Sequence, residues 1–506
     1  MRIRLLPWLK SSLLLAPLLA HAGITLGPGF KDHAVVQRGK PLPVWGQATP
    51  GEKLVVTFRG QTLNTTVDAN GRWIVYFEPF DASAEPAELT IAGTETVVVH
   101  DVLVGEVWLA SGQSNMEWPV SSLQDDEKQI AQTDLPNLRH LRIEHTVAGA
   151  PAESVSTSSW ESASPQTVGG FTAIGYFFAR ELQRKLGVPV GIIHSSWGGT
   201  AIEAWMSENA RMSTALGTAI EARWKEAMDN WPPERVAQYA VEMASWQKGE
   251  EEAKATQTKN PLAWPQPPAS LDSPARPGGL FNGMIAPLQP TAIRGVLWYQ
   301  GESNVGRAGE YAELLTAMIH SWRENWGDDS LPFYVVQLPN FANGNPGGRE
   351  WARLREAQAK ILELPAAAVV VAIDLGDPEN LHPPTKMELG RRLALAAKSQ
   401  LYAIPGDYSG PVFESAMREG STMRVRFTHA DSGLVSHHRP VQSLEIAGAD
   451  HVFHVGVGKI DRNTLVVSSP EVNEPVAVRY AWSNAPAANL YDGSGLPAMP
   501  FRSDDW

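Results

Sequence analysis

Short apolar runs separated by turn-forming residues follow residue 22. The runs at 53–58 and 73–77 are rich in β-branched and aromatic residues, which favour strands. Between them, the segment 68–71 reads Asp-Ala-Asn-Gly and is typical of a hairpin turn, because Asn and Gly tolerate a positive φ. This spacing of short strands predicts a small β-sandwich over residues 23–104.

The pattern changes at residue 105, where apolar strands begin to alternate with helices. Strands are expected at 106–110, 189–194, 293–300, 333–337 and 368–374, and helices at 173–185, 311–326, 351–362 and 387–397. Apolar strands separated by helices predict a parallel sheet that is covered on both faces. In such sheets the chemistry lies at the carboxyl ends of the strands. We therefore expect a catalytic α/β domain over residues 105–399.

Two further segments depart from this alternation. Residues 206–279 hold charged helical stretches and then a Pro-rich run, which indicates an inserted lid or cap. Beyond residue 400 the short strands return, and they predict a C-terminal β module over residues 400–506.

The first 22 residues predict export. A positively charged start is followed by an apolar run at 13–20 that is too short to span a bilayer, and Ala20-His21-Ala22 offers small residues to a signal peptidase. We expect a signal peptide over residues 1–22 and a mature protein in the periplasm or outside the cell. No later stretch of the sequence is long and apolar enough for a membrane helix, so we expect no membrane partner.

Composition narrows the function classes. The 506 residues are 43% hydrophobic and 19% charged, which is typical of a globular protein. A formal net charge of -13 argues against nucleic acid as a partner. The absence of cysteine excludes disulfides, thiolate metal sites and a cysteine nucleophile. The 18 Trp suit either a core or flat platforms for sugar rings.

Four of the expected strands are followed by polar or glycine-rich loops. Ser114 stands in a turn after the first strand, where its hydroxyl would be exposed and backbone amides would face an oxyanion. Gly198 and Gly199 follow the second strand, and paired glycines allow a close approach and leave amides free. Each signal alone is also typical of an ordinary tight turn.

The other two loops supply side chains. Glu302, Ser303 and Asn304 follow the third strand. The loop after the fifth strand, 368–374, carries His382, with carboxylates just upstream that would orient its imidazole. The four loops together provide a nucleophile, amide donors, polar side chains and a base. That set is what acyl transfer requires.

The loop sequences also carry a resemblance. They read Gly-Gln-Ser-Asn-Met at 112–116, Trp-Gly-Gly-Thr at 197–200, Trp-Tyr-Gln-Gly-Glu-Ser-Asn at 298–304 and Leu-His-Pro at 381–383, with similar matches at 35–38, 101–108, 281–288, 476–482 and 489–491. The chain resembles the SGNH hydrolases and, more narrowly, the sialate O-acetylesterase family, over nearly the whole mature length. The resemblance implies a flavodoxin-like three-layer α/β/α core with flanking β modules, and hydrolysis of acetyl esters on sugars.

The resemblance also implies roles for individual residues. Ser114 would be the nucleophile and His382 the base, with no metal or other cofactor. The oxyanion hole would use the backbone amides of Ser114 and of Gly198 or Gly199, and a side chain from Gln300, Ser303 or Asn304. Contacts to the substrate would come from Gln113, Asn115, Trp197 and Glu302.

Two positions depart from the SGNH pattern. The third block usually reads Gly-x-Asn-Asp, but here it is Gly-Glu-Ser-Asn, which leaves the side-chain donor open. The family has Asp three residues before the histidine, and this chain has Glu379 there. Glu379 ranks slightly ahead of Asp377 on spacing, and a Ser–His dyad without a carboxylate is the third alternative.

We expect an acetylated glycan as the substrate. The Trp content and acidic net charge suit a neutral plant polysaccharide such as acetylated xyloglucan or xylan at least as well as sialic acid. Three other interpretations are a noncatalytic carbohydrate-binding protein, a lipase or thioesterase of the same fold with a long acyl channel, and a glycosidase that uses Glu302. The last would need a second carboxylate at a set separation.

Overall fold

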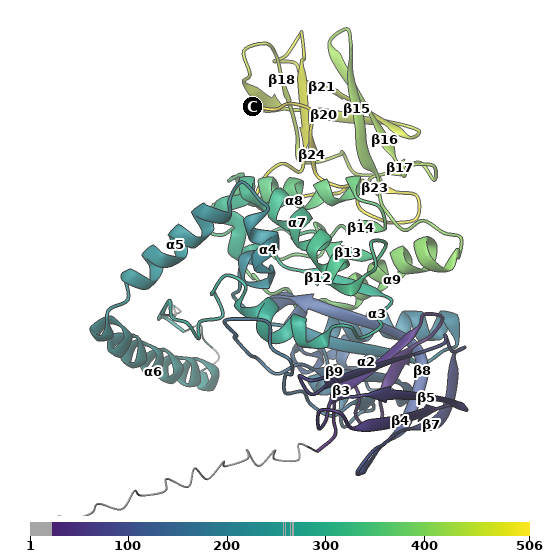
Figure 1. Cartoon of the computed structure of the whole chain (residues 1–506). Coiled ribbons are helices and arrows are strands. Elements are labelled where there is room, and N and C mark those ends of the chain that lie inside the picture. Colours follow the sequence, from purple (N-terminus) through teal and green to yellow (C-terminus); the bar gives the residue numbers. More distant parts are fainter. Residues whose placement is uncertain (1–22, 257, 259, 264, 266–267) are drawn as a thin grey trace, which may run out of the picture.

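The structure is a computed structural model that describes residues 23–256, 258, 260–263, 265 and 268–506 (Figure 1). The expected signal peptide over residues 1–22 therefore lies outside the described residues. Within the described ranges, no helix combines the length and the apolar character needed to cross a membrane.

Short strands form the N-terminal region. One sheet has the order β1-β3-β6, with bounds Thr25–Leu26, Leu42–Gln47 and Arg72–Phe77. Beside it, β4 pairs with β5 and β7, with bounds Lys53–Phe58, Gln61–Thr66 and Ser83–Ala92. Exposed and buried positions alternate strictly along β6 and over much of β4, so each sheet buries one face.

One long strand, β8 (Thr96–Gly112), runs from this region into the core. Its first half pairs with β7 and with β2 (Val35–Gln37), and its second half pairs with β11 and β12. Burial changes along the strand, because exposed and partly buried positions precede residue 102 and every later position is buried. The boundary expected after residue 104 thus falls inside a continuous strand.

The core is a parallel sheet in the order β9-β11-β8-β12-β13-β14, with β10 (Glu161–Ala163) antiparallel at one edge. The strands have the bounds Leu135–Arg142 (β9), Val190–Ser196 (β11), Gly295–Tyr299 (β12), Phe333–Val336 (β13) and Ala367–Val370 (β14). The helices that follow these strands along the chain are α2 (Asp125–Ala131), α3 (Ala173–Leu186), α7 (Ala308–Trp326), α8 (Glu350–Ala359) and α9 (Met387–Tyr402). The predicted α/β class is confirmed.

Helices cover both faces of this sheet (Figure 1). Trp108 on β8 packs edge-on against Phe178 of α3, with ring centroids 4.8 Å apart. Trp298 on β12 packs against Trp322 of α7 at 5.8 Å. Trp108 pairs with Gly295, and side chains alternate along a strand, so Trp298 points to the opposite face. Helix α9 packs on α3 and α8 on α7, which completes one helical layer on each side.

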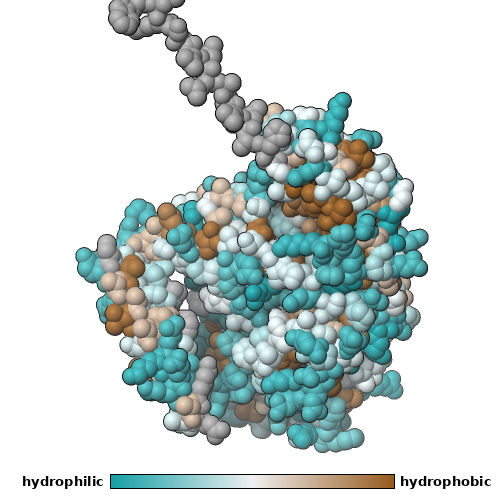
Figure 2. Space-filling model, turned by 90° about the horizontal axis from the view of Figure 1, so that it is seen from below, coloured by the Kyte–Doolittle hydropathy of each residue, from teal (hydrophilic) through white to brown (hydrophobic). Residues whose placement is uncertain are grey.

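The segment expected to be an insertion forms an arm beside the core. It contains α4 (Glu208–Met212), α5 (Gly217–Asp229) and α6 (Pro233–Thr256). Arg223 of α5 holds it to α7 through two hydrogen bonds of 2.9 Å to Glu310. Seen from below, the arm stands at one side of the body, and apolar side chains on this face lie in small groups among polar ones (Figure 2).

Two further sheets form the C-terminal region, which has its own hydrophobic core. One has the order β15-β16-β21-β20, with bounds Val412–Glu419, Thr422–Thr428, Thr464–Ser468 and Val457–Asp461. The other has the order β19-β18-β22-β24, with bounds Phe453–Val455, Leu444–Ala447, Ala477–Tyr480 and Phe501–Arg502. A short pair joins β17 (Leu434–Val435) and β23 (Tyr491–Asp492).

Candidate active site

Ser114 lies just beyond the carboxyl end of β8, where it opens the short helix α1 (Ser114–Glu117). Gly112 makes this turn possible. Its φ is 135°, and a Cβ there would lie 2.0 Å from the carbonyl oxygen of Tyr299, so a larger residue would force β8 and β12 apart. The Gln113 amide donates a 2.9 Å hydrogen bond to the same carbonyl. The turn that carries the hydroxyl is therefore fixed by the neighbouring strand.

His382 lies in the loop between β14 and α9, and its Nε2 is 2.8 Å from Ser114 Oγ. The His382 amide donates a 2.9 Å hydrogen bond to Asn380 Oδ1, which shapes the loop. The Trp118 ring stacks on the imidazole, with centroids 5.3 Å apart and an interplanar angle of 22°. A distance of 2.8 Å is short enough for the imidazole to accept the hydroxyl proton.

The surroundings of His382 favour a neutral imidazole. Burial lowers its pKa, and the charge of Lys386 lowers it further. In the described part of the chain, neither Asp377 nor Glu379 contacts the ring: Asp377 Oδ1 accepts a 2.9 Å hydrogen bond from the Glu379 amide, and the Glu379 side chain is exposed. The two carboxylates named from the sequence thus lie near His382 in the chain without bonding to it.

Asn115, the residue after Ser114, connects the nucleophile's turn to the loop that carries His382. Its Nδ2 donates to Glu302 Oε1 at 2.6 Å and to the carbonyl of Leu381 at 3.1 Å, while its Oδ1 accepts a 2.6 Å hydrogen bond from Lys386 Nζ. Burial lowers the pKa of Lys386 to about 7, although Glu302 and Glu127 oppose this shift. Burial also raises the pKa of Glu302. Asn115 and Glu302, expected to contact substrate, are engaged in this buried network.

Three amide side chains form a second buried network. Gln300 Nε2 donates to Gln113 Oε1 at 3.1 Å and to Asn304 Oδ1 at 2.8 Å. Asn304 Nδ2 donates to Glu203 Oε2 at 2.9 Å. Gln300, Gln113 and Asn304 are all at most 2% exposed. The side-chain NH₂ groups of Gln300 and Asn304 are therefore occupied within the protein, whereas Gln113 takes part in the network through its Oε1 as an acceptor.

The glycine loop lies directly against the nucleophile. A Cβ on Gly198 would lie 3.2 Å from Ser114 Cβ, and the Gly198 amide donates a 2.7 Å hydrogen bond to Glu117 Oε2. Gly199 is exposed, with a φ of 74°. In the described part of the chain, the amides of Ser114 and Gly199 and the hydroxyl of Ser303 donate no hydrogen bond. These three groups are the free donors of the predicted oxyanion set.

Sequence reasoning missed Glu117 and its partner His145. Glu117 Oε1 lies 3.0 Å from His145 Nε2, and the His145 ring stacks on Trp197 with centroids 4.0 Å apart. Burial alone would raise the pKa of Glu117, but the hydrogen bond and the charge of His145 lower it overall. The available signal was spacing, since Glu117 lies one helical turn after Ser114.

Lys386 was also missed, although it follows His382 by four residues. Nothing in the loop sequence distinguishes a buried lysine from an ordinary exposed one. For a metal, the described residues offer no cluster of three or more His, Asp or Glu side chains.

A parallel sheet that brings a serine and a histidine together at its carboxyl edge is the arrangement typical of α/β hydrolytic enzymes. A family model described as "Carbohydrate esterase, sialic acid-specific acetylesterase" matches residues 104–265 and 270–399, more than half of the chain. The chain belongs to this family and is a carbohydrate O-acetylesterase. The family predicted from the loop sequences is thereby confirmed.

Whole-chain similarities agree with the family. The crystal structure of a carbohydrate acetylesterase from Xanthomonas citri is 38% identical, has a TM-score of 0.81, and covers 96% of this chain and 100% of its own. The sialate O-acetylesterase of Mus musculus is 28% identical over 96% of both chains. The Homo sapiens enzyme of the same name is 27% identical over 96% of this chain and 95% of its own.

Proposed function

We propose that the protein is an exported serine esterase that removes acetyl groups from neutral plant glycans through an acyl-enzyme. The observation that carries this proposal is the 2.8 Å separation of Ser114 Oγ and His382 Nε2 beside free backbone amides. We further infer that the α/β core is the flavodoxin-like three-layer core of SGNH hydrolases. The strand order and the helices on both faces support this inference.

In this mechanism His382 Nε2 accepts the proton of Ser114 Oγ as the oxygen attacks the acetyl carbonyl. The tetrahedral oxyanion forms beside the amides of Ser114 and Gly199, with the Ser303 hydroxyl as the third donor. His382 then gives its proton to the sugar oxygen as the bond between that oxygen and the acetyl carbon breaks, so the sugar leaves as an alcohol and the acetyl group stays on Ser114. Water, activated by the same imidazole, attacks the acetyl-serine and releases acetate. No step requires a metal.

Gly199 is preferred over Gly198 as the glycine donor because of Glu117. The Gly198 amide already binds a carboxylate, and a second negative charge at the same amide would be repelled. In this arrangement Glu117 acts as a positioning residue, which holds Gly198 against Ser114.

Aromatic rings beside the nucleophile suit a sugar substrate. Trp118 stacks on His382, and Trp197 lies with His145 next to the Gly198 loop. Flat rings of this kind bind the apolar faces of pyranose rings. The predicted substrates are acetylated xyloglucan and xylan.

A panel of acetylated substrates tests the substrate class. We expect acetate release from acetylated xyloglucan or xylan to exceed release from O-acetyl sialic acid in kcat/KM, and long-chain p-nitrophenyl esters to be turned over poorly. Exclusive activity on sialic acid would overturn the neutral-glycan assignment. Release of reducing sugar without acetate would favour the glycosidase alternative.

The carboxylates upstream of His382 are expected to matter little. Because neither touches the imidazole, Asp377→Asn and Glu379→Gln should each lower kcat/KM by less than about 10-fold, compared with the ~10⁴-fold that a triad aspartate is worth. The measurement is hydrolysis of p-nitrophenyl acetate by each variant. A fall of about 1000-fold in either variant would identify that carboxylate as the orienting group and reject the dyad.

Removing the buried lysine should move the acid limb of the pH profile. His382 must be neutral to accept a proton, and the charge of Lys386 lowers its pKa, so Lys386→Met should raise that pKa and shift the limb to higher pH. The shift is partial, because burial is the larger cause. The test is kcat/KM for p-nitrophenyl acetate between about pH 4 and pH 8. Lys398→Met is the matched control, because Lys398 lies in helix α9, which begins directly after Lys386, and its Nζ is 3.9 Å from Glu181 Oε2. If the acid limb stays in place or moves to lower pH in Lys386→Met, the charge of Lys386 does not lower the pKa of the catalytic base.

A further inference from the structure

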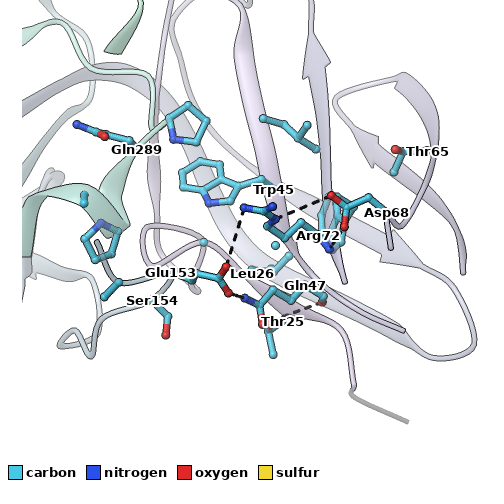
Figure 3. A pocket seen from close by; sticks show the side chains of 18 of the residues that line it. Thr25, Leu26, Trp45, Gln47, Thr65, Asp68, Arg72, Glu153, Ser154 and Gln289 are labelled. Atoms are coloured by element: carbon cyan, nitrogen blue, oxygen red, sulfur yellow. Dashed lines mark hydrogen bonds and ion pairs between the residues drawn. The ribbon is translucent and has the colours of Figure 1, made fainter. Parts of the chain in front are cut away.

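A cleft of about 620 Å³ lies where the N-terminal region meets the core, away from Ser114 and His382. Strands β1, β3 and β6 form one wall, and residues 152–154 and 286–290 form the other. Its volume falls in the range of small-molecule sites. Figure 3 shows Trp45 at its centre, with Arg72 between Asp68 and Glu153.

Trp45 is held rigidly in this cleft. A Cβ on Gly27 would lie 2.4 Å from the indole, so the glycine backbone packs directly on the ring. Phe30 adds an edge-on contact, with centroids 5.0 Å apart. An aromatic surface that is fixed before binding loses little entropy when a ligand covers it.

Polar groups around Trp45 are already paired with one another. Gln47 Nε2 donates a 2.6 Å hydrogen bond to Glu153 Oε2. Arg72 Nη1 lies 4.0 Å from Glu153 Oε1, and Arg72 Nε lies 3.9 Å from Asp68 Oδ2. The Arg72, Asp68 and Glu153 side chains are each about half exposed, so their remaining donors and acceptors are open to a ligand. Two carboxylates against one guanidinium repel an anion, and they suit hydroxyl groups.

A single loop joins the cleft to the catalytic site. At one end His145 pairs with Glu117, and at the other Glu153 lines the cleft. Eight residues span at most ~29 Å when fully extended, which limits the separation of the two places. One polysaccharide chain is long enough to contact both.

We propose that this cleft is a second carbohydrate-binding site, which takes a neutral oligosaccharide segment of the polymer that Ser114 deacetylates. Trp45 packs against a sugar ring, and Arg72, Asp68, Glu153 and Gln47 bind its hydroxyls. The site rests on the proposed glycan substrate. It supplies affinity for the polymer rather than chemistry.

Binding by the full chain with Ser114→Ala tests this site, because the readout does not depend on hydrolysis. The probes are xyloglucan oligosaccharides and, as an anionic sugar, sialyllactose, both followed by calorimetry. We expect Arg72→Ala and Trp45→Ala to weaken xyloglucan binding about 10-fold, the loss of one good contact. The matched control is Tyr76→Ala, which removes an exposed ring from the same face of β6 outside the cleft. Melting curves verify the fold, and Arg72, an exposed side chain, keeps the test valid if the Trp45 variant unfolds.

Equal affinity in Arg72→Ala and in the parent overturns the proposal, as does sialyllactose binding that Arg72→Ala abolishes. If the Ser114→Ala protein binds no xyloglucan, the cleft is not a glycan site. The esterase assignment is judged separately by acetate release, so the two proposals fail in distinguishable ways.

Discussion

Ser114→Ala should lower kcat/KM for p-nitrophenyl acetate by roughly 10⁴–10⁶-fold and leave the fold intact. The hydroxyl is the atom that attacks, and no neighbouring group replaces it. The matched control is Ser111→Ala at the end of the same strand, because the buried Ser111 hydroxyl has no hydrogen-bond partner in the described part of the chain. Turnover of the Ser111 variant should stay near that of the parent.

The partner of Ser114 makes this prediction sharper. His382→Ala should cause a loss of similar size, and the double variant should lose little more, because residues that act as one unit are not additive. If the two losses multiply, Ser114 and His382 act in separate steps. A Ser114→Ala protein with parental turnover would remove the nucleophile assignment altogether.

The sequence predicted the meeting of Ser114 and His382 because parallel strands end at one edge of their sheet. β8 and β14 are far apart in the chain, but their carboxyl ends lie on the same side, and the segments that follow them carry Ser114 and His382. Pattern and topology therefore suffice to place residues at a sheet edge. They do not determine which way a side chain points within a loop.

Side-chain direction is where the sequence was insufficient. Asn304 and Gln300 follow the right strand, but their amides bond to Glu203 and to one another beneath the site. Glu379 has the family spacing, and its carboxylate faces solvent. These side-chain directions depend on hydrogen-bond partners from segments that are distant in the sequence, and a local sequence pattern does not contain that information.

The expected boundary after residue 104 shows a different limit. The apolar pattern does change there, because β8 passes from a sheet with one buried face to a sheet with two. A change in burial, however, does not require a break in the backbone. Gly105 stands at this point, but it stays within the ladder instead of forming a turn, so one strand continues through both sheets.

Among charged residues, Glu106 on β8 is the one whose replacement is expected to lower the free energy of unfolding most. Its fully buried carboxylate accepts hydrogen bonds from Arg38 Nε at 2.5 Å and Arg294 Nε at 2.7 Å. Arg38 comes from the N-terminal region and Arg294 from the segment before β12, so the carboxylate joins three segments. Glu106→Gln removes the charge that both guanidinium groups share.

The expected loss is about 3 kcal/mol in the free energy of unfolding, near the low end for a broken buried pair, because water reaches the two arginines in part. Denaturant titration followed by tryptophan fluorescence measures it. Glu88→Gln is the control, since its pair with His100 is exposed and is worth little. Because β8 ends at the turn that holds Ser114, the Glu106 variant should also lose activity at a lower denaturant concentration than the parent. Equal midpoints for the two variants would contradict this prediction and show that the charge of Glu106 does not stabilise the junction of the three segments.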